Sequence, residues 1–181
     1  MAAHIALHEV GVAFESRVIS FARKEHQSPD FLAVNPEGTV PTLLIDGRRL
    51  TAVAAILFYL ARRFPQTDLL PAADVEAEAQ AISWMSFIAA TIHPARRLGL
   101  ARSNAVFALA DRRLGQRDWA LARYSIADIH LFRLYWRFAH PLHPPAGTFP
   151  NLAAHYERMM ARPAVQRTCA IEQAIGYELP P

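Results

Sequence analysis

The sequence contains a single cysteine, Cys169, which lies near the C-terminal end of its 181 residues. One cysteine excludes an internal disulfide framework, and we interpret Cys169 as a structural or incidental residue. The sequence also lacks an apolar run of about 18 residues and a leader with charged, apolar and small-residue parts. We therefore expect no membrane span, no signal peptide and a cytoplasmic location.

Lysine is almost absent, because Lys24 is the only lysine among 19 lysine and arginine residues that give a net charge of +3. The arginines occur in dispersed pairs: Arg48-Arg49, Arg62-Arg63 and Arg96-Arg97. A protein that binds nucleic acid usually concentrates its basic residues on one face or along one helix. We therefore predict that nucleic acid is not a partner.

Metal-ligand spacings are also lacking, although the sequence has eight histidines. His4 and His8 would share one face of a helix, but no third or fourth ligand follows at a recognisable spacing. The glutamate of an H-E-x-x-H site is absent as well. We predict no metal site.

Apolar residues make up 52% of the sequence, which is enough to bury the core of one compact body or of two small domains. Within residues 35–60, two apolar runs flank Asp46-Gly47, a pair that tolerates the positive φ angles of a two-residue hairpin turn. A helical spacing of apolar residues follows, with Thr51 placed as the N-cap and Pro65 as the stop. This segment therefore predicts a short antiparallel hairpin followed by a helix.

Two patterns predict further helices in the second half of the chain. Apolar residues recur on one face from Asp74 to His93, and Pro94 should kink or end that helix, leaving 95–111 as a bent continuation or a second helix. Ser125 and Asp128 form a near capping box, for which a structural role outweighs a catalytic one.

Residues 35–60, NPEGTVPTLLIDGRRLTAVAAILFYL, resemble the glutathione S-transferases. The thioredoxin-like domain of that family carries an N-P-x-G-x-V-P-x-L segment, a D-G turn and a T-E-S-x-A-I-x-x-Y-L helix start. The resemblance implies a cis bond between Val40 and Pro41, with the backbone of Val40 pairing with the cysteinyl part of glutathione. The residues alone leave a plain edge-strand proline as the alternative.

The sequence departs from the family at the helix start, where Ala52 and Val53 replace the Glu-Ser pair that holds the γ-glutamyl part of glutathione. A charge-assisted hydrogen bond contributes about 1.5–3 kcal/mol, so each loss would weaken binding about tenfold to a hundredfold. The helix N-terminus still offers unpaired N–H groups and the positive end of its dipole. We therefore expect weak glutathione binding at Val40, Pro41, Ala52 and Val53, or another ligand.

A second departure is at the start of the chain, where residues 1–20 resemble the first helix and second strand of the family domain. The family's first strand, and the loop that supplies a Tyr, Ser or Cys to activate the thiol, are missing from the sequence. The start is truncated or misassigned, or the chain is a degenerate relative. The family resemblance implies a homodimer, and a sheet without an interior strand adds a reason to associate.

Within the family, the bacterial beta class is the nearest match, because its W-x-x-F-I-x-x-x-x-H segment is present: Trp84, Phe87, Ile88 and His93. The resemblance makes His93 the catalytic residue that reaches the thiol, and the alternative is a helix-end histidine bonded to a carbonyl. Ser86 stands two helical turns earlier, where the class often has Asn, so both would face one groove. Trp136 aligns with the aromatic wall of the co-substrate pocket, and a core role is the alternative.

We therefore expect an incomplete thioredoxin-like α/β domain at residues 1–67 that lacks its first strand, followed by an all-α domain at 72–181. Residues 66–72 form the linker, and 149–165 resemble the family's last long helix. Two functions fit these features. One is a glutathione S-transferase-like protein that conjugates or binds glutathione with a small-molecule electrophile, with weak activity. The other is a non-catalytic binding or dimerisation module with the same fold.

Overall fold

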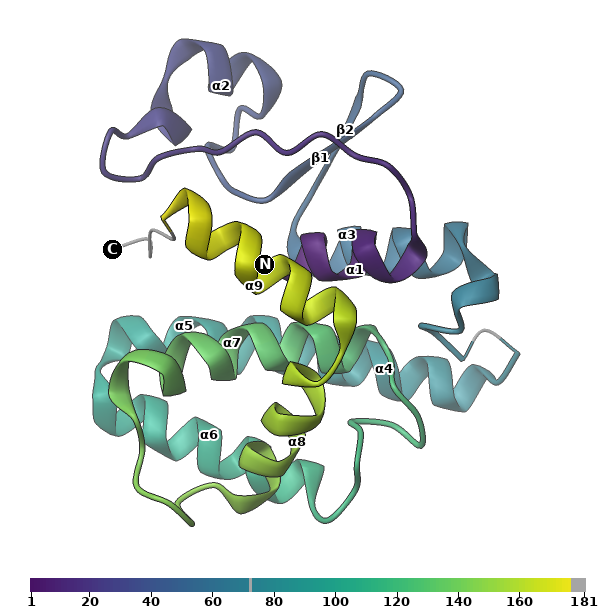
Figure 1. Cartoon of the computed structure of the whole chain (residues 1–181), viewed down its shortest axis with the longest axis vertical. Coiled ribbons are helices and arrows are strands. Elements are labelled where there is room, and N and C mark those ends of the chain that lie inside the picture. Colours follow the sequence, from purple (N-terminus) through teal and green to yellow (C-terminus); the bar gives the residue numbers. More distant parts are fainter. Residues whose placement is uncertain (72, 177–181) are drawn as a thin grey trace.

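The computed structural model describes residues 1–71 and 73–176 of the chain. Its N-terminal part contains one hairpin, three α-helices and a short 3₁₀ turn: α1 (Ala2–Val10), η1 (Glu25–Gln27), α2 (Pro29–Val34), β1 (Thr42–Ile45), β2 (Arg48–Thr51) and α3 (Val53–Arg63). The helical part lies below it in Figure 1. The predicted α/β domain and all-α domain are therefore both present, while the exact division at 67 and 72 stays a prediction, and Ala72 and 177–181 lie outside the described residues.

The hairpin forms where the sequence predicts it. β1 and β2 pair antiparallel with Ile45 opposite Arg48, which leaves a two-residue turn between them. The turn residues Asp46 and Gly47 have φ angles of 50° and 77°. Positive φ at both positions is what a turn needs to match the twist of the flanking strands.

The segment after α1 does not form the second strand that the sequence predicts within residues 1–20. β1 and β2 are the only strands among the described residues, and 12–20 pair with neither. The segment folds back on α1 instead, where the Phe14 ring centre lies 5.6 Å from that of His4 and 5.1 Å from that of His8. A strand requires a ladder of backbone hydrogen bonds to a neighbouring strand, and residues 12–20 form none. Side-chain packing on α1 holds this segment instead.

The helix predicted from Asp74 to His93 is a helical run that changes type along its length. It passes from α4 (Val75–Phe87) through a π-helical turn (η3, Ile88–Ile92) to α5 (His93–Ala95) and a 3₁₀ turn (η4, Arg96–Leu98). Pro94 lacks the N–H that an α-helix requires at its position, and such gaps in the hydrogen-bond ladder kink helices. A second helix, α6 (Leu100–Leu114), follows Gly99, in place of a bent continuation.

The capping box at the start of α7 (Ile126–Leu142) is confirmed. The Ser125 hydroxyl accepts the N–H of Ala127 at 3.2 Å, and the Asp128 carboxylate accepts the N–H of Ser125 at 2.9 Å. His155, which the sequence interpretation did not single out, places Nε2 3.0 Å from the other oxygen of Asp128. All three side chains are buried, so Ser125, Asp128 and His155 form an internal polar brace rather than a solvent-facing site.

The helix that residues 149–165 resemble is broken into two. α8 (Pro150–Met160) ends before Arg162, whose φ and ψ of −80° and 132° are extended, and α9 (Pro163–Ile175) begins at the next residue. A residue that precedes proline is disfavoured in the helical region, so Pro163 both ends one helix and starts the other.

The two parts of the chain are joined by a partly buried polar contact. α9 runs beside α1 in Figure 1, and Arg162 at its start donates two hydrogen bonds to Glu9 of α1, at 2.8 and 3.1 Å. The Tyr124 hydroxyl donates to the same carboxylate at 2.9 Å. Between the parts, the 3₁₀ turn η2 (Pro65–Thr67) leads to Leu69, whose carbonyl accepts the N–H of Ile126 at 2.9 Å.

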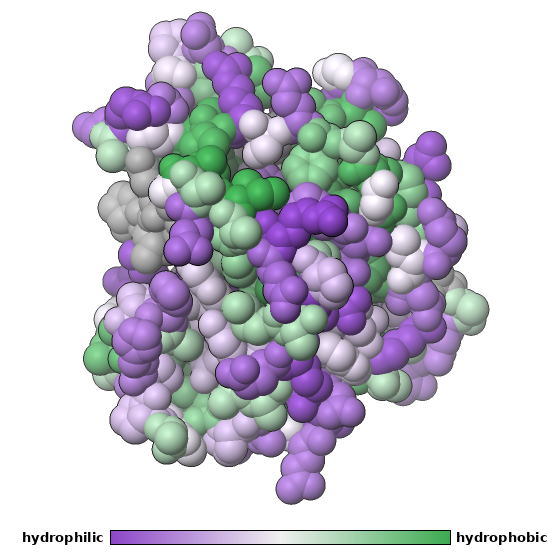
Figure 2. Space-filling model, viewed as in Figure 1, coloured by the Kyte–Doolittle hydropathy of each residue, from purple (hydrophilic) through white to green (hydrophobic). Residues whose placement is uncertain are grey.

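Two buried apolar clusters hold the fold together. One joins α1 and α3 to α7 and α9, and the other joins α4, α6, α7 and α8. Figure 2 shows hydrophobic surface in the upper part of the view. The N-terminal part exposes five large apolar side chains: Val18, Leu32, Val40, Leu44 and Phe58. Among the described residues, no helix has the length and apolar character needed to span a bilayer.

Candidate functional site

The peptide bond between Val40 and Pro41 is cis, as predicted. The loop before it is organised by Asn35, which is fully buried and donates its amide to the carbonyl of Thr39 at 2.8 Å and to the Thr42 hydroxyl at 3.1 Å. The sequence interpretation did not assign Asn35 a role. Its signal was the Asn-Pro-x-Gly turn, in which an Asn side chain commonly bonds its own following backbone; here its oxygen accepts the N–H of Glu37 at 3.1 Å.

The hairpin brings the Val40-Pro41 edge next to the start of α3. Thr42, the first residue of β1, lies opposite Thr51, the last residue of β2. Pro41 and Ala52 are the residues that flank this pair, so they lie at the same end of the hairpin. Four of the predicted glutathione-binding residues are therefore grouped: Val40, Pro41, Ala52 and Val53.

The start of α3 lacks a side-chain cap. The N-cap residue is Ala52, with a φ of 66°, and not Thr51 as the sequence predicted. Thr51 belongs to the β ladder, and its hydroxyl donates to Glu37 at 3.4 Å instead of capping the helix. The N-cap residue therefore offers no side-chain acceptor to the first N–H groups of α3.

Glu37 places a carboxylate beside this helix start. Its two oxygens accept the hydroxyls of Thr51 and Thr39, each at 3.4 Å. Glu37 was not among the predicted site residues, because the family motif leaves its position unspecified. The end of the hairpin thus combines an acceptor carboxylate with free N–H donors.

His93 lies at the start of α5, directly after the π-helical turn. Partial burial, together with the positive charges of Arg133, Arg137 and Arg97, lowers the pKa of His93 to about 4. The imidazole is therefore neutral at pH 7, with one N–H donor and one nitrogen acceptor.

Three basic residues of α7 accompany His93, and the sequence interpretation missed all three. His130, Arg133 and Arg137 are three to four residues apart, so they share one face of α7, and their spacing was the available signal. His130 is buried, and burial with the charges of Arg133 and His93 lowers its pKa to about 3. Arg133 also acts on the amino group of Met1 at the start of α1.

Ser86 and Trp136 are less closely tied to His93. Ser86 is exposed on α4, and the π-helical turn between Ser86 and His93 holds more residues than an α turn, so the two-turn spacing does not apply across it. Trp136 is half-buried on α7, and the His140 ring stacks on it at 4.7 Å between centres and 11° between planes. The binding roles of both residues remain predictions.

Trp84 of the beta-class segment lines a cavity beside Arg113. Arg113 lies over the ring of Trp84, at 4.4 Å, and over that of Phe87, at 4.9 Å. A cavity of about 340 Å³ opens here between α4 and the chain after α6, lined in part by Arg113 and Arg117. His93 does not line this cavity.

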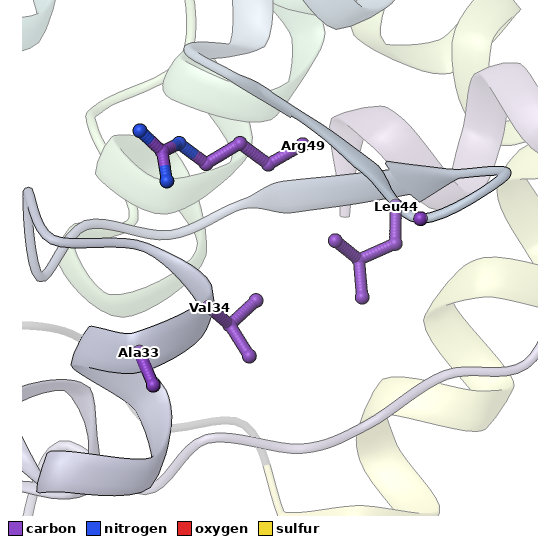
Figure 3. Close-up of a pocket in the computed structure, with 5 residues that line it drawn as sticks. Ala33, Val34, Leu44 and Arg49 are labelled. Atoms are coloured by element: carbon purple, nitrogen blue, oxygen red, sulfur yellow. The ribbon is translucent and has the colours of Figure 1, made fainter.

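A further cavity of about 370 Å³ lies between α2 and the outer face of the hairpin (Figure 3). Leu44 and Arg49, which pair across the hairpin, line it together with Ala33 and Val34. Side chains alternate between the faces of a strand, and Leu43 packs against the core on the opposite face. This cavity is therefore separate from the Val40-Pro41 edge.

No group of three or more histidine, cysteine, aspartate or glutamate side chains that could hold a metal ion occurs in the described part of the chain. His4 and His8 pack against Phe14.

Comparisons with known proteins agree on one family. Residues 1–62 match the model for the glutathione S-transferase N-terminal domain, and 97–163 match the model for its C-terminal domain. The glutathione S-transferase GstA of Escherichia coli O157:H7 is 31% identical over 192 aligned positions, which cover 95% of this chain and 93% of that protein.

Solved structures are similar over the same extent. BphK, a bacterial glutathione S-transferase solved as a ternary complex, has a TM-score of 0.84 at 29% identity, covering 95% of this chain and 94% of that one. A sphingomonad glutathione S-transferase complexed with glutathione has a TM-score of 0.83 at 32% identity, covering 95% and 93%. With the paired hairpin and the helical part described above, these matches show that the chain belongs to the glutathione S-transferase family.

Proposed function

We propose that the protein binds glutathione at the end of the hairpin and conjugates it, weakly, to small electrophiles. The observation that carries this proposal is the position of the cis Val40-Pro41 bond beside the start of α3, set by the pairing of Thr42 with Thr51. The Val40 backbone would pair with the cysteinyl part of glutathione. The free N–H groups of α3 would bind the γ-glutamyl carboxylate.

The carboxylate of Glu37 compensates in part for the absent Glu-Ser pair. The γ-glutamyl part of glutathione carries an ammonium group as well as a carboxylate, and Glu37 lies beside Thr51 at the helix start. We assign Glu37 to the ammonium group. Its exposure makes the interaction weaker than a buried one, because solvent screens the charges.

His93 is the residue proposed to act on the sulfur. A neutral imidazole can donate its N–H to a thiolate, which favours the thiolate over the thiol, and the thiolate is the attacking species. With an aryl chloride, the sulfur–carbon bond forms as the carbon–chlorine bond breaks. Chloride leaves, and the proton of the thiol passes to the buffer.

Calorimetric titration with reduced glutathione, paired with a conjugation assay on a chlorodinitrobenzene, tests this proposal. Binding with conjugation that falls at least tenfold in His93→Gln is the expected result. Ser86→Ala and Trp136→Leu measure the two remaining predicted roles: the first should weaken glutathione binding, and the second should raise the KM for the electrophile.

A non-catalytic binding or dimerisation module is the second candidate. The observation that favours it is the start of α3, where Ala52 and Val53 offer no side-chain hydrogen bond to a ligand. Glutathione binding without conjugation, or neither from a folded protein, would select this candidate.

Three finer assignments belong to the same proposal. The beta class is supported by the Trp84, Phe87, Ile88 and His93 spacing, a homodimer by membership of the family, and a cytoplasmic location by the composition. Light scattering at micromolar concentration tests the dimer, and a monomer would contradict it.

A further inference from the structure

Two arginines of the helical part line the same cavity and have no anion beside them. Arg113 and Arg117 line the cavity of about 340 Å³ between α4 and the chain that follows α6. In Figure 1, this chain returns past the start of α4 before α7 begins. Within residues 1–71 and 73–176, neither arginine forms an ion pair.

Contacts with neutral groups hold both guanidinium groups in place. Arg113 donates to the hydroxyl of Ser83 at 2.8 Å and lies over the ring of Trp84, 4.4 Å from its centre. Nε of Arg117 donates to the carbonyl of Leu114 at 2.9 Å, and a second nitrogen donates to the carbonyl of Arg113. A guanidinium group has five N–H donors, so these contacts position each group and leave donors for a ligand. Side chains that are already ordered lose little entropy when a ligand binds.

The positive charges of the two arginines repel each other. Burial, together with the charge of Arg117, lowers the pKa of Arg113. Both groups nevertheless stay protonated, because arginine is not deprotonated in proteins. The carbonyl groups at the end of α6 contribute only the partial negative charge of a helix terminus, about half an elementary charge. A negatively charged ligand between the arginines would therefore relieve a repulsion that the described residues leave in place.

The acidic residues that are nearest in the sequence have partners outside the cavity. Asp118 forms an ion pair with Arg158 at 3.4 Å. Asp111 is buried, and its carboxylate accepts the backbone N–H of Leu152 at 2.9 Å. The acidic residues of α4 do not line the cavity either. Among the described residues, the charges at the wall of the cavity are therefore those of the two arginines.

Part of the remaining wall is small and apolar. Ala77 of α4 contributes to it from one side, and Ala120, Leu121 and Ala122 contribute from the chain after α6. Pockets for small molecules usually have volumes of about 300–1,000 Å³, so this cavity suits a compact ligand. Such a ligand would place an anionic group at the arginines and a small apolar group against the alanines.

We propose that this cavity binds a phosphate monoester, with the phosphate group between Arg113 and Arg117. Arginine donates paired N–H groups to phosphate oxygens, and two guanidinium groups match a dianion. A phosphate monoester has a second pKa of about 6 and is therefore close to a dianion above pH 7. A sulfate ester or a carboxylate carries one negative charge, which would leave one arginine without a counter-charge. The inference goes beyond the proposed function, because His93 does not line this cavity.

Calorimetry with phenyl phosphate and phenyl sulfate at pH 8 tests the charge match, because the two esters have the same shape and differ in one charge. The buffer contains neither phosphate nor sulfate. We expect saturable binding of phenyl phosphate and at least tenfold weaker binding of phenyl sulfate. Equal affinities for the two esters, or no saturable binding of phenyl phosphate, would overturn the proposal.

Substitution of each arginine locates the binding. Arg113→Gln should weaken phenyl phosphate binding about tenfold to a hundredfold, since it removes a half-buried charge. Arg117→Gln should weaken it roughly threefold, because this side chain is exposed and solvent screens its charge. Arg112→Gln is the matched control, because Arg112 is exposed on α6 and does not line the cavity. Binding that is unchanged in both the Arg113 and the Arg117 variant would contradict the proposal.

A substitution on the α4 side of the cavity tests the site with both arginines and their contacts intact. Ala77→Glu adds a negative charge in the first turn of α4, where an acidic residue stabilises a helix. Ala77→Gln has the same size without the charge. We expect phenyl phosphate to bind much more weakly to the glutamate variant than to the glutamine variant, with both folded by circular dichroism. Native affinity in Ala77→Glu would show that the ligand does not lie in this cavity.

Competition with reduced glutathione separates this site from the proposed glutathione site. Glutathione also carries carboxylates, so displacement of phenyl phosphate by glutathione that disappears in Arg113→Gln would assign the cavity to glutathione and overturn the proposal. Phenyl phosphate binding that depends on Arg113, in a chain that does not bind glutathione, would support this site and reject only the proposed function.

Discussion

Thr42 lies directly opposite Thr51 in the β1–β2 ladder, and this one pairing positions the predicted glutathione-binding residues. It brings the cis Val40-Pro41 bond to the end of the hairpin at which α3 begins. It also places Glu37 beside that helix start, through the hydroxyl of Thr51. A backbone edge, helix N–H groups and a carboxylate thus come together without a catalytic side chain in the hairpin.

Restoring side chains at the start of α3 should raise glutathione affinity. The double substitution Ala52→Glu, Val53→Ser adds a carboxylate and a hydroxyl next to the free N–H groups, and each charge-assisted hydrogen bond contributes about 1.5–3 kcal/mol. We expect the dissociation constant from calorimetry to fall at least tenfold. Gln80→Glu adds a charge on the exposed surface of α4 and should leave it unchanged. Equal affinity in the double variant would mean that this helix start is not the γ-glutamyl site.

Removing the charge of Glu37 should lower the affinity for glutathione. Glu37→Gln keeps a hydrogen-bond acceptor for Thr51 but loses attraction for the γ-glutamyl ammonium group, so we expect glutathione binding to weaken about tenfold. Cysteinylglycine, which lacks the γ-glutamyl part, should bind both proteins equally. Glu15→Gln is the control for loss of an exposed charge in the N-terminal part. A matching loss with cysteinylglycine would show that Glu37 acts on the loop structure instead.

The buried histidine of α7 should make the fold less stable in mild acid. Burial, with Arg133 and His93, lowers the pKa of His130 to about 3, so between about pH 6.5 and 3 the unfolded chain binds a proton that the folded chain does not. The contribution of His130 to the free energy of unfolding is therefore at its full value above pH 6.5 and falls as the pH drops through this range, by about 2 kcal/mol between pH 6.5 and 5.

Urea denaturation at several pH values measures this slope. His130→Gln removes one titrating group and should reduce the slope by the contribution of that group, whatever its effect at pH 7. His143→Asn, in an exposed position with positive φ that Asn tolerates, should retain the native slope. A slope that is identical in His130→Gln and the native chain would rule out His130 as its source.

The contact between α1 and α9 should contribute more to the free energy of unfolding than an exposed ion pair does. Arg162 and Glu9 form a two-point ion pair with side chains 29% and 15% exposed, and Tyr124 donates to the same carboxylate. Arg162→Gln should lower the free energy of unfolding by about 2 kcal/mol. Arg123→Gln, which breaks an exposed pair with Asp68, should cost about 1 kcal/mol or less. Equal losses in the two variants would contradict a special role for Arg162.

Local chemistry made much of the fold predictable from the sequence. Asp46-Gly47 specifies its turn through positive φ, and Ser125 with Asp128 specifies a helix start through two reciprocal hydrogen bonds. The cis bond at Pro41 came from the family resemblance and not from the residues alone. The turn and the helix start depend on neighbours in the sequence, so the local pattern contains the information that specifies them.

The wrong predictions concern residues whose structure depends on contacts with residues that are distant in the sequence. Thr51 has the chemistry of an N-cap, but its ladder position opposite Thr42 makes Ala52 the cap. Residues 12–20 resemble a strand, yet Phe14 packs on α1 and these residues pair with no strand among the described residues. The influence of Arg133 on His93 was missed because it depends on the packing of α7 against the π-helical turn.

Amide NMR during titration with reduced glutathione tests whether the end of the hairpin is a glutathione site, because it reports binding and its location together. We predict saturable shifts at the backbone N–H groups of Val40, Val53 and Ala54. With cysteinylglycine, the shift at Val40 should persist while those at Val53 and Ala54 disappear. Unshifted amides at all three residues at saturating glutathione, in a protein with a folded spectrum, would contradict the claim that the end of the hairpin is a glutathione site.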